Sequence, residues 1–185
     1  MTVDNGDIIL QMKSGNLKIT RQKHIASDFV ITPDWCAKDI ITYFKPTGKI
    51  LDPCRGEGAF YKSIPQGSYW CEIRQGKDFF DFNKKVDWII GNPPYSIFDR
   101  WLMHSYDIAD NIVYLVPTYK IFNPLGIIRM IKSRGHVKHL RIYDVGRKIP
   151  WARGRPIAAA YIKKGYYGPM EWSFYKQEDE FFTDK

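Results

Sequence analysis

The sequence predicts an α/β fold with a mostly parallel sheet and an antiparallel hairpin at the sheet edge. Short apolar runs alternate with helical stretches, a glycine-containing turn follows the first central run, and a loop without a helix joins the last two runs. Strands that alternate with helices form a parallel sheet covered on both faces. Connections such as the one between Glu72 and Val86 are too short for a full helix, so we expect trimmed helices.

The elements follow in order from an N-terminal extension, residues 1–28, in which two short alternating runs predict a hairpin. The first helix is expected to begin at Thr32, a good N-cap residue, because Pro33 suits the first helical position. Apolar residues as far as Phe44 give this helix a buried face, and Pro46 ends it.

The rest of the chain alternates between the two element types. The runs predicted to be strands are Lys49 to Leu51, Tyr69 to Cys71, Val86 to Ile90, Ile112 to Val116, Val137 to Tyr143 and Ile157 to Ile162. The stretches predicted to be helices are Ala59 to Ile64, Ile97 to Ala109 and Leu125 to Ser133. We therefore expect one domain at residues 29–170 and a C-terminal tail at 171–185.

The composition indicates a single intracellular domain. The 185 residues are enough for one real core. No apolar run approaches the roughly 20 residues that span a bilayer, and the first residues lack the order of a signal peptide, so a soluble, cytoplasmic protein without a membrane partner is expected. Cys36, Cys54 and Cys71 include no C-x-x-C pair, so neither a disulfide framework nor a metal site is expected.

Positive charge is concentrated in one stretch of the chain. Between Lys120 and Lys164 there are twelve basic residues and one acid, Asp144, which gives this stretch a charge of +11 in a chain of net charge +8. A basic face can simply aid solubility, but a one-sided basic segment is also typical of nucleic-acid binding. Trp151 and Tyr161 lie among these charges, and stacking commonly accompanies phosphate contacts. Nucleic acid is therefore the first partner to consider.

The tetrapeptide Asn92-Pro93-Pro94-Tyr95 is the most informative motif, because it follows an apolar run that reads as a buried strand. Proline fixes φ and has no N–H, so a carbonyl near Pro93 can accept a hydrogen bond beside the Asn92 side-chain oxygen. Tyr95 can stack on a flat ring. This combination suits a substrate that presents a planar NH₂ group.

A second group of residues suits a nucleoside. The turn from Asp52 to Gly58 follows the first central strand, where glycines let backbone N–H groups approach a ligand, although a plain structural turn would also explain it. Glu72 comes about twenty residues later, the spacing at which a carboxylate accepts hydrogen bonds from ribose hydroxyls. Asp78-Phe79 could bind an adenine amino group and cover its ring. Taken singly, each is more often a surface acid or a core aromatic.

Together with Thr32-Pro33, these motifs resemble, in their order, those of S-adenosylmethionine-dependent amino-methyltransferases that make N6-methyladenine in DNA. The cofactor motifs precede Asn92-Pro93-Pro94-Tyr95, which is similar to the gamma class of that family. The resemblance covers Phe29 to Gly165. It implies a Rossmann-like class I methyltransferase fold, with S-adenosylmethionine as the cofactor and one catalytic domain.

The resemblance also implies roles for individual residues. The cofactor would be held by Thr32, Pro33, Asp52, Pro53, Gly56, Gly58, Glu72, Asp78 and Phe79. The catalytic residues would be Asn92, Pro93, Pro94 and Tyr95. The target base is buried in a duplex, so it must be flipped out before its amino group can reach them.

The loop between the last two predicted strands would contact the substrate. The family places an aromatic residue in this loop, and here Trp151 would stack on the base, although an aromatic that packs under the loop is the alternative. Phosphate contacts on the same loop would come from Arg147, Lys148, Arg153 and Arg155.

Several readings of the substrate and partners stay open at this stage. The family usually carries a separate target-recognition domain, and none is expected here. Recognition would then be relaxed, or would come from a partner subunit, a homodimer or loops such as Pro117 to Pro124. The alternatives to a DNA adenine substrate are an RNA adenine or guanine amino group, the side-chain amide of a protein glutamine, and a non-catalytic nucleic-acid-binding module.

Overall fold

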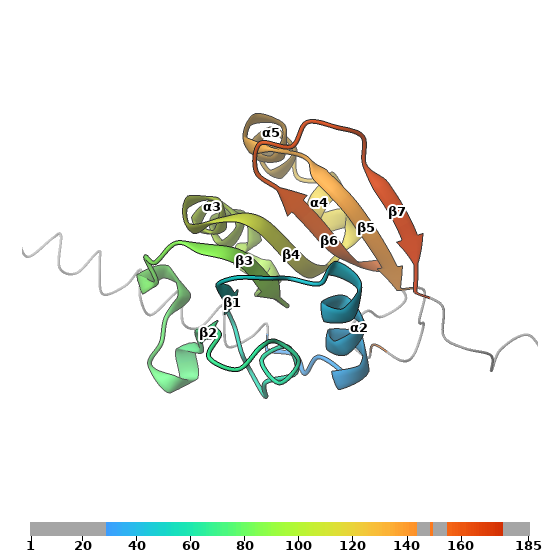
Figure 1. Ribbon diagram of the computed structural model, residues 1–185. Coiled ribbons are helices and arrows are strands. Elements are labelled where there is room, and N and C mark those ends of the chain that lie inside the picture. Colours follow the sequence, from blue (N-terminus) through green and yellow to red (C-terminus); the bar gives the residue numbers. More distant parts are fainter. Residues whose placement is uncertain (1–28, 144–148, 150–154, 176–185) are drawn as a thin grey trace, which may run out of the picture.

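The computed structural model describes residues 29–143, 149 and 155–175, and these contain a seven-stranded sheet in the order β2-β1-β3-β4-β6-β5-β7 (Figure 1). The strands are β1 (Ile50–Asp52), β2 (Tyr69–Trp70), β3 (Val86–Gly91), β4 (Ala109–Pro117), β5 (Val137–Tyr143), β6 (Ile157–Lys163) and β7 (Glu171–Phe174). The helices are α2 (Asp34–Phe44), α3 (Phe98–Ile108), α4 (Thr118–Phe122) and α5 (Leu125–Arg134), with 3₁₀ turns η1 (Ile73–Gln75), η2 (Phe79–Asp81) and η3 (Tyr95–Ile97). The predicted N-terminal hairpin lies outside the described residues.

The sheet is parallel except for β6, which pairs antiparallel with both β4 and β5. The predicted antiparallel pairing of the last two runs is therefore confirmed, but its place at the sheet edge is wrong. β7 pairs in parallel with β5 and forms the edge instead. This strand has only four residues, most of them exposed, and short exposed strands carry little hydrophobic signal.

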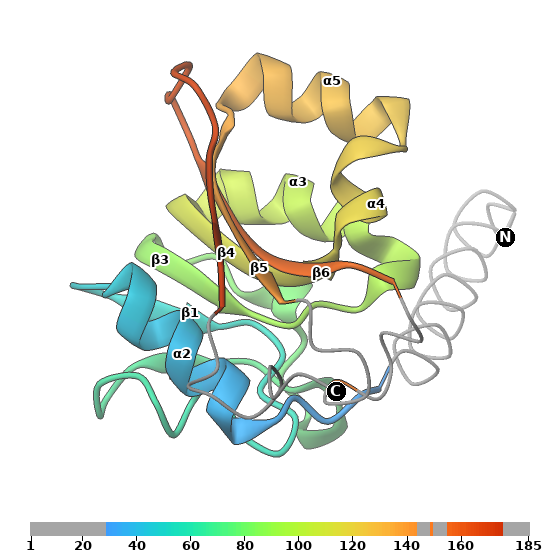
Figure 2. The same ribbon diagram turned by 90° about the vertical axis from the view of Figure 1, so that its right-hand side faces the viewer.

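The two faces of the sheet pack into separate cores. Figure 2 shows α3, α4 and α5 on one face and α2 on the other. Successive residues of the central strands point to opposite faces, so Ile89 joins the core under α3 and α5, whereas Ile90 joins the core under α2. Because β3 and β4 are covered on both faces, their apolar runs are continuous, as expected for buried parallel strands.

Three predicted helices form, and the trimmed connections are as expected. The helices at α2, α3 and α5 are confirmed. The stretch between Glu72 and Val86 contains only η1 and η2, as its length predicted. The helix predicted from Ala59 to Ile64 is wrong, since this stretch forms only turns. Pro65 limits the segment to about one turn, too short to repay the cost of starting a helix.

The predicted N-cap role of Thr32 is also wrong. The residue at the N-cap of α2 is Pro33, and no side chain caps the helix. The Thr32 hydroxyl instead accepts a hydrogen bond from Asn92 Nδ2 at 3.1 Å. The threonine therefore connects the start of α2 to the end of β3.

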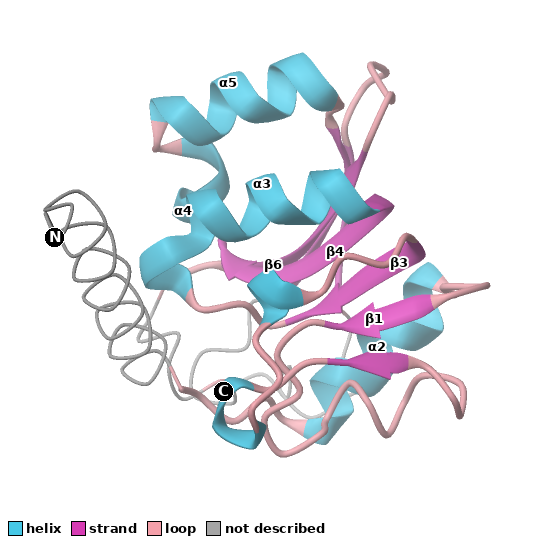
Figure 3. Cartoon of the chain, turned by 90° about the vertical axis from the view of Figure 1, so that its left-hand side faces the viewer, coloured by secondary structure: helices cyan, strands magenta, loops and turns pink. Residues whose placement is uncertain are grey.

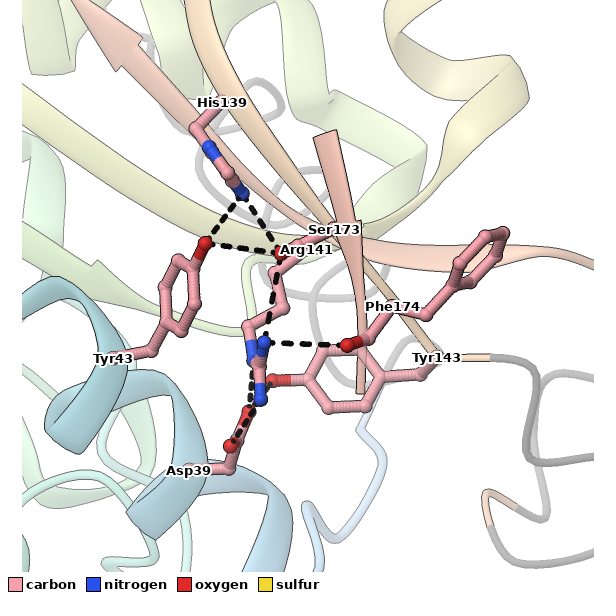
Figure 4. Close-up of polar contacts among 7 residues, drawn as sticks. All are labelled: Asp39, Tyr43, His139, Arg141, Tyr143, Ser173 and Phe174. Carbon is pink, nitrogen blue, oxygen red and sulfur yellow. Dashed lines mark hydrogen bonds and ion pairs between the residues drawn. The ribbon is translucent and has the colours of Figure 1, made fainter. Parts of the chain in front are cut away.

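A polar network joins α2 to β5 and β7 on the α2 face of the sheet (Figure 4). Arg141 donates two hydrogen bonds to the Asp39 carboxylate, at 2.6 and 2.8 Å. The Tyr143 hydroxyl donates to the same carboxylate at 2.6 Å, and His139 lies 2.9 Å from both Tyr43 Oη and Ser173 Oγ. These contacts fix α2 against the edge of the sheet.

Within the described ranges, no helix is both long and apolar enough to cross a lipid bilayer.

Candidate active site

A cavity of about 430 Å³ opens beside the residues that follow β1, β2 and β3, at the carboxyl ends of these strands. Its lining residues are Phe29, Val30, Pro53, Cys54, Gly56, Glu72, Ile73, Arg74, Asp78, Phe79, Asn92, Pro94 and Trp101. Figure 3 shows the end of the sheet from which these loops leave β1 and β3. Ligands of open α/β sheets bind at this end, and the volume lies within the usual range for small-molecule sites.

The structure brings most of the predicted cofactor residues to this cavity. Those that line it are Pro53, Gly56, Glu72, Asp78 and Phe79. Asp52 directly precedes the lining residue Pro53, and Pro33 and Thr32 stand at the start of α2. Gly58 is also outside the lining, and a side chain there would meet those of Lys62 and Arg55. Of the four predicted catalytic residues, Asn92 and Pro94 line the cavity.

Two glycines at this end of the sheet, one in the turn after β1 and one at the end of β3, are required for different reasons. Gly56 has a φ of +53°, which other residues adopt at a cost, and its N–H donates to Glu72 Oε2 at 2.8 Å. Gly91, at the end of β3, would place a side-chain Cβ only 3.0 Å from Pro53 Cδ. The absence of a side chain at Gly91 therefore allows the ends of β1 and β3 to approach each other.

Glu72 is buried and already hydrogen-bonded within the protein. Besides the Gly56 N–H, it accepts from the backbone N–H of Arg74 at 3.0 Å and from Arg74 Nε at 3.1 Å. It thus fixes the glycine turn to the loop that follows β2. A ligand hydroxyl bound by this carboxylate would share its oxygens with the protein donors.

Sequence reasoning missed six of the lining residues, namely Phe29, Val30, Cys54, Ile73, Arg74 and Trp101. The Arg74 guanidinium lies 3.9 Å from the centre of the Phe29 ring, so the two side chains stack at the cavity. The Trp101 ring packs against Phe79 with ring centres 4.4 Å apart. Cys54 Sγ donates to the Asn92 backbone carbonyl at 3.0 Å. The only available signal was at Trp101, an apolar residue on the buried face of the predicted helix; the others depend on tertiary contacts.

The Asn92 side chain is held at both ends. Its Nδ2 donates to Thr32 Oγ1, and its Oδ1 accepts from the Tyr95 hydroxyl at 2.7 Å. The Tyr95 hydroxyl also lies 3.1 Å from the Leu115 carbonyl oxygen, and the ring packs against the core. Tyr95 is absent from the cavity lining in the described part of the chain, so its stacking role stays a prediction.

Asp52 is the most perturbed acid of the site. It is 1% exposed, and burial raises the pKa of its carboxyl from 3.8 to about 7. Oδ1 accepts from the Cys54 N–H at 3.2 Å, whereas Oδ2 has no hydrogen-bond partner among the described residues. Burial also raises the pKa of the Cys54 thiol well above its usual value, which keeps it protonated as a donor. A carboxylate buried without full pairing favours a positively charged ligand nearby.

Most of the predicted substrate-binding loop lies outside the described residues, namely Arg147, Lys148, Trp151 and Arg153. Arg155 is described and exposed, and its Nη1 donates to the Tyr119 hydroxyl at 3.3 Å. The neighbouring Lys120 donates from Nζ to the Tyr95 carbonyl at 2.8 Å. Lys120 therefore contacts the tetrapeptide that was predicted to be catalytic, and Arg155 contacts the residue that precedes Lys120.

Comparison with known proteins shows the fold. No protein-family model matches the sequence, and no curated protein does. A solved structure assigned to the class I S-adenosylmethionine-dependent methyltransferases, from Listeria monocytogenes, is 12% identical, with a TM-score of 0.58 over 78% of this chain. The M protein of the type I restriction enzyme EcoKI is 14% identical, with a TM-score of 0.54 over 74% of this chain.

A methyltransferase subunit of a type I restriction-modification system from Streptococcus thermophilus is similar too, at 12% identity and a TM-score of 0.52 over 75% of this chain. The chain spans 65%, 44% and 45% of these three proteins, respectively. It therefore has the Rossmann-like fold of class I methyltransferases. At these identities the likeness concerns the fold alone.

Proposed function

We propose that the protein is an S-adenosylmethionine-dependent methyltransferase that acts on the N6 amino group of adenine in DNA. One observation carries this proposal: the glycine turn, Glu72, Asp78 and Asn92 line a single cavity in a methyltransferase-like fold. A cofactor site and an acceptor for a planar amino group are thus adjacent, as direct transfer between two bound molecules requires.

The volume of the cavity and several of its lining side chains support the proposed cofactor. Glu72 and Asp78 supply carboxylates, and Phe79 and Trp101 supply apolar surface. S-adenosylmethionine carries an ammonium and a sulfonium, and the incompletely paired Asp52 carboxylate beneath the glycine turn suits such a ligand. By resemblance, Asp78 and Phe79 would hold the adenine, Glu72 the ribose, and Gly56 the methionine part. When bound, the cofactor supplies a methyl group open to in-line attack.

The catalytic work assigned to the chain is the preparation of the target nitrogen. The lone pair of an adenine N6 is delocalised into the ring, so the nitrogen is a poor nucleophile. Hydrogen bonds from its NH₂ group to Asn92 Oδ1 and to the Pro93 carbonyl would draw it towards tetrahedral geometry. The backbone carbonyl of Asn92 already accepts a hydrogen bond from the Cys54 thiol. Among the described residues, no donor forms a hydrogen bond to the backbone carbonyl of Pro93. No general base is needed before transfer, because the nitrogen becomes acidic only once methylated.

A nucleic-acid substrate is supported by uncompensated positive charge at the site. Residues 111–143 contain no acid, and neither Arg155 nor Lys120 forms an ion pair among the described residues. Phosphates would neutralise these cations, whereas a glutamine side chain would not. A DNA target in a duplex would be flipped out to reach Asn92. For target recognition we propose a partner subunit, since two of the similar structures are named as parts of restriction-modification enzymes.

The proposal is tested by incubating the protein with labelled S-adenosylmethionine and four substrates in parallel. These are duplex DNA, single-stranded DNA, RNA and a glutamine-bearing protein, followed by nucleoside and peptide mass analysis. We expect label as N6-methyladenine in DNA only. Label in RNA or in methylglutamine would reassign the substrate, and cofactor binding without any transfer would favour a non-catalytic module.

A further inference from the structure

The Asn92 carboxamide is fixed by two hydroxyl groups from different parts of the chain. Thr32, just before α2, accepts from Nδ2 at 3.1 Å. Tyr95, three residues downstream, donates to Oδ1 at 2.7 Å. Thr32 is 9% exposed, so water has little access to replace its hydroxyl. Residues from two different parts of the chain therefore contact both ends of this amide.

We propose that Thr32 is a positioning residue that orients the Asn92 carboxamide, and that the Tyr95 hydroxyl caps the amide oxygen until a target amino group displaces it. This inference rests on the proposed function, in which Asn92 Oδ1 receives the target NH₂ group. It gives Thr32 a role different from the cofactor contact that the family resemblance implies.

The two ends of a carboxamide have opposite hydrogen-bonding character, so its orientation decides what a substrate meets. The oxygen accepts hydrogen bonds, whereas the nitrogen only donates them. A flipped Asn92 would present an NH₂ group to the NH₂ group of the base, and neither could accept. By holding Nδ2, the Thr32 hydroxyl leaves the oxygen on the other side. Loss of that hydroxyl would leave a half-buried amide nitrogen unpaired, so the carboxamide would lose its contact on the α2 side.

The Tyr95 hydroxyl has a second acceptor within reach, which makes its displacement inexpensive. It has one proton, and the Leu115 carbonyl oxygen lies 3.1 Å from it. Rotation about the C–O bond moves that proton from Asn92 Oδ1 to Leu115 without a shift of the ring. A target amino group can therefore take the amide oxygen while the phenol stays hydrogen-bonded.

Three substitutions test the inference against wild type. Thr32→Val has nearly the same shape without the hydroxyl, Thr32→Ser restores the hydroxyl, and Tyr95→Phe removes only the cap. Cofactor affinity is measured by calorimetry with S-adenosylmethionine, and transfer by single turnover on duplex DNA at saturating cofactor. Melting temperatures confirm that each variant is folded.

We expect Thr32→Val to lower the transfer rate at least about tenfold, with cofactor affinity within about twofold of wild type. Thr32→Ser should recover most of the rate. Tyr95→Phe should speed hydrogen exchange of the Asn92 side-chain amide, because the amide oxygen loses its hydroxyl partner. The positioning role is overturned if Thr32→Val matches the wild-type rate, or if it weakens cofactor binding and leaves the saturated rate unchanged. Unchanged exchange of that amide in Tyr95→Phe would overturn the capping role.

A readout independent of activity separates this inference from the proposed function. The side-chain amide resonance of Asn92 is identified in ¹⁵N-labelled protein by its loss in Asn92→Asp. Hydrogen exchange of this amide should be faster in Thr32→Val than in wild type or Thr32→Ser. Equal exchange in all three would overturn the orientation by Thr32. If the wild type transfers no methyl group but the exchange differs, the proposed function fails and the orientation stands.

Discussion

Two polar clusters in this molecule differ in how completely they are paired. In the network between α2 and β5, the Asp39 carboxylate accepts three hydrogen bonds, two from Arg141 and one from Tyr143. At the cavity, by contrast, Asp52 is more deeply buried, yet one of its oxygens has no partner among the described residues. The fully paired Asp39 thus connects α2 to β5, whereas Asp52, next to the cavity-lining Pro53, has an oxygen that a ligand could still pair with.

The first prediction tests the structural cluster. Asp39→Ala removes the carboxylate and leaves the Arg141 guanidinium, which is 12% exposed, without its partner. Because an unpaired buried charge is costly, we expect the free energy of unfolding to fall by about 3–5 kcal/mol in urea titrations. The matched control is Asp107→Ala, which breaks the exposed ion pair to Arg134 and should cost less than about 1 kcal/mol. Equal losses of unfolding free energy in the two variants would mean that the α2 network stabilises the fold no more than an exposed ion pair does.

The second prediction concerns Asn92, which lines the cavity. Asn92→Ala should lower methyl transfer by about 100- to 1000-fold, the loss typical of a preorganised hydrogen-bonding group. Cofactor affinity and melting temperature should change little, because the assigned partner of Asn92 is the target amino group. Radiometric assays and calorimetry measure the two quantities separately. A variant that keeps most of its turnover would remove Asn92 from catalysis.

The third prediction concerns the pH dependence of stability that Asp52 introduces. Its folded-state pKa is raised from 3.8 to about 7, so between these values the folded protein binds more protons than the unfolded chain. Stability should therefore fall as pH rises from about 4 to 7, by roughly 2–4 kcal/mol from this group. Asp52→Asn should remove that slope in denaturation curves taken across this range. If the slope persists in the variant, it belongs to other groups.

The fourth and smallest effect is expected at Arg155. Removal of one phosphate contact should reduce the slope of log affinity against log salt by about 0.9 for duplex DNA. Arg155→Ala is compared with Lys38→Ala, which removes the same charge from an exposed position on α2. Fluorescence anisotropy over a salt series gives both slopes. The same change in both variants would point to net charge rather than to a contact.

The local sequence pattern was enough to predict the buried strands and the motifs that follow their carboxyl ends. Apolar runs predicted β3 and β4, and two motifs predicted to lie together, after β1 and β3, contribute Gly56 and Asn92 to one cavity. Their proximity could be predicted because neighbouring parallel strands place their carboxyl ends on the same edge of the sheet. β7 was missed because its four residues pair with β5 without a buried face of their own.

The fold class and most of the cavity wall could be predicted because hydrophobic periodicity and turn chemistry act over a few residues. The contact of Asn92 with Thr32 depends on long-range packing instead, since Thr32 lies 60 residues away and its local sequence predicts a helix cap. The same holds for the stack of Arg74 on Phe29 and for the placement of β7 at the edge. Such contacts join residues that are distant in the chain, and no local propensity specifies which distant groups will meet.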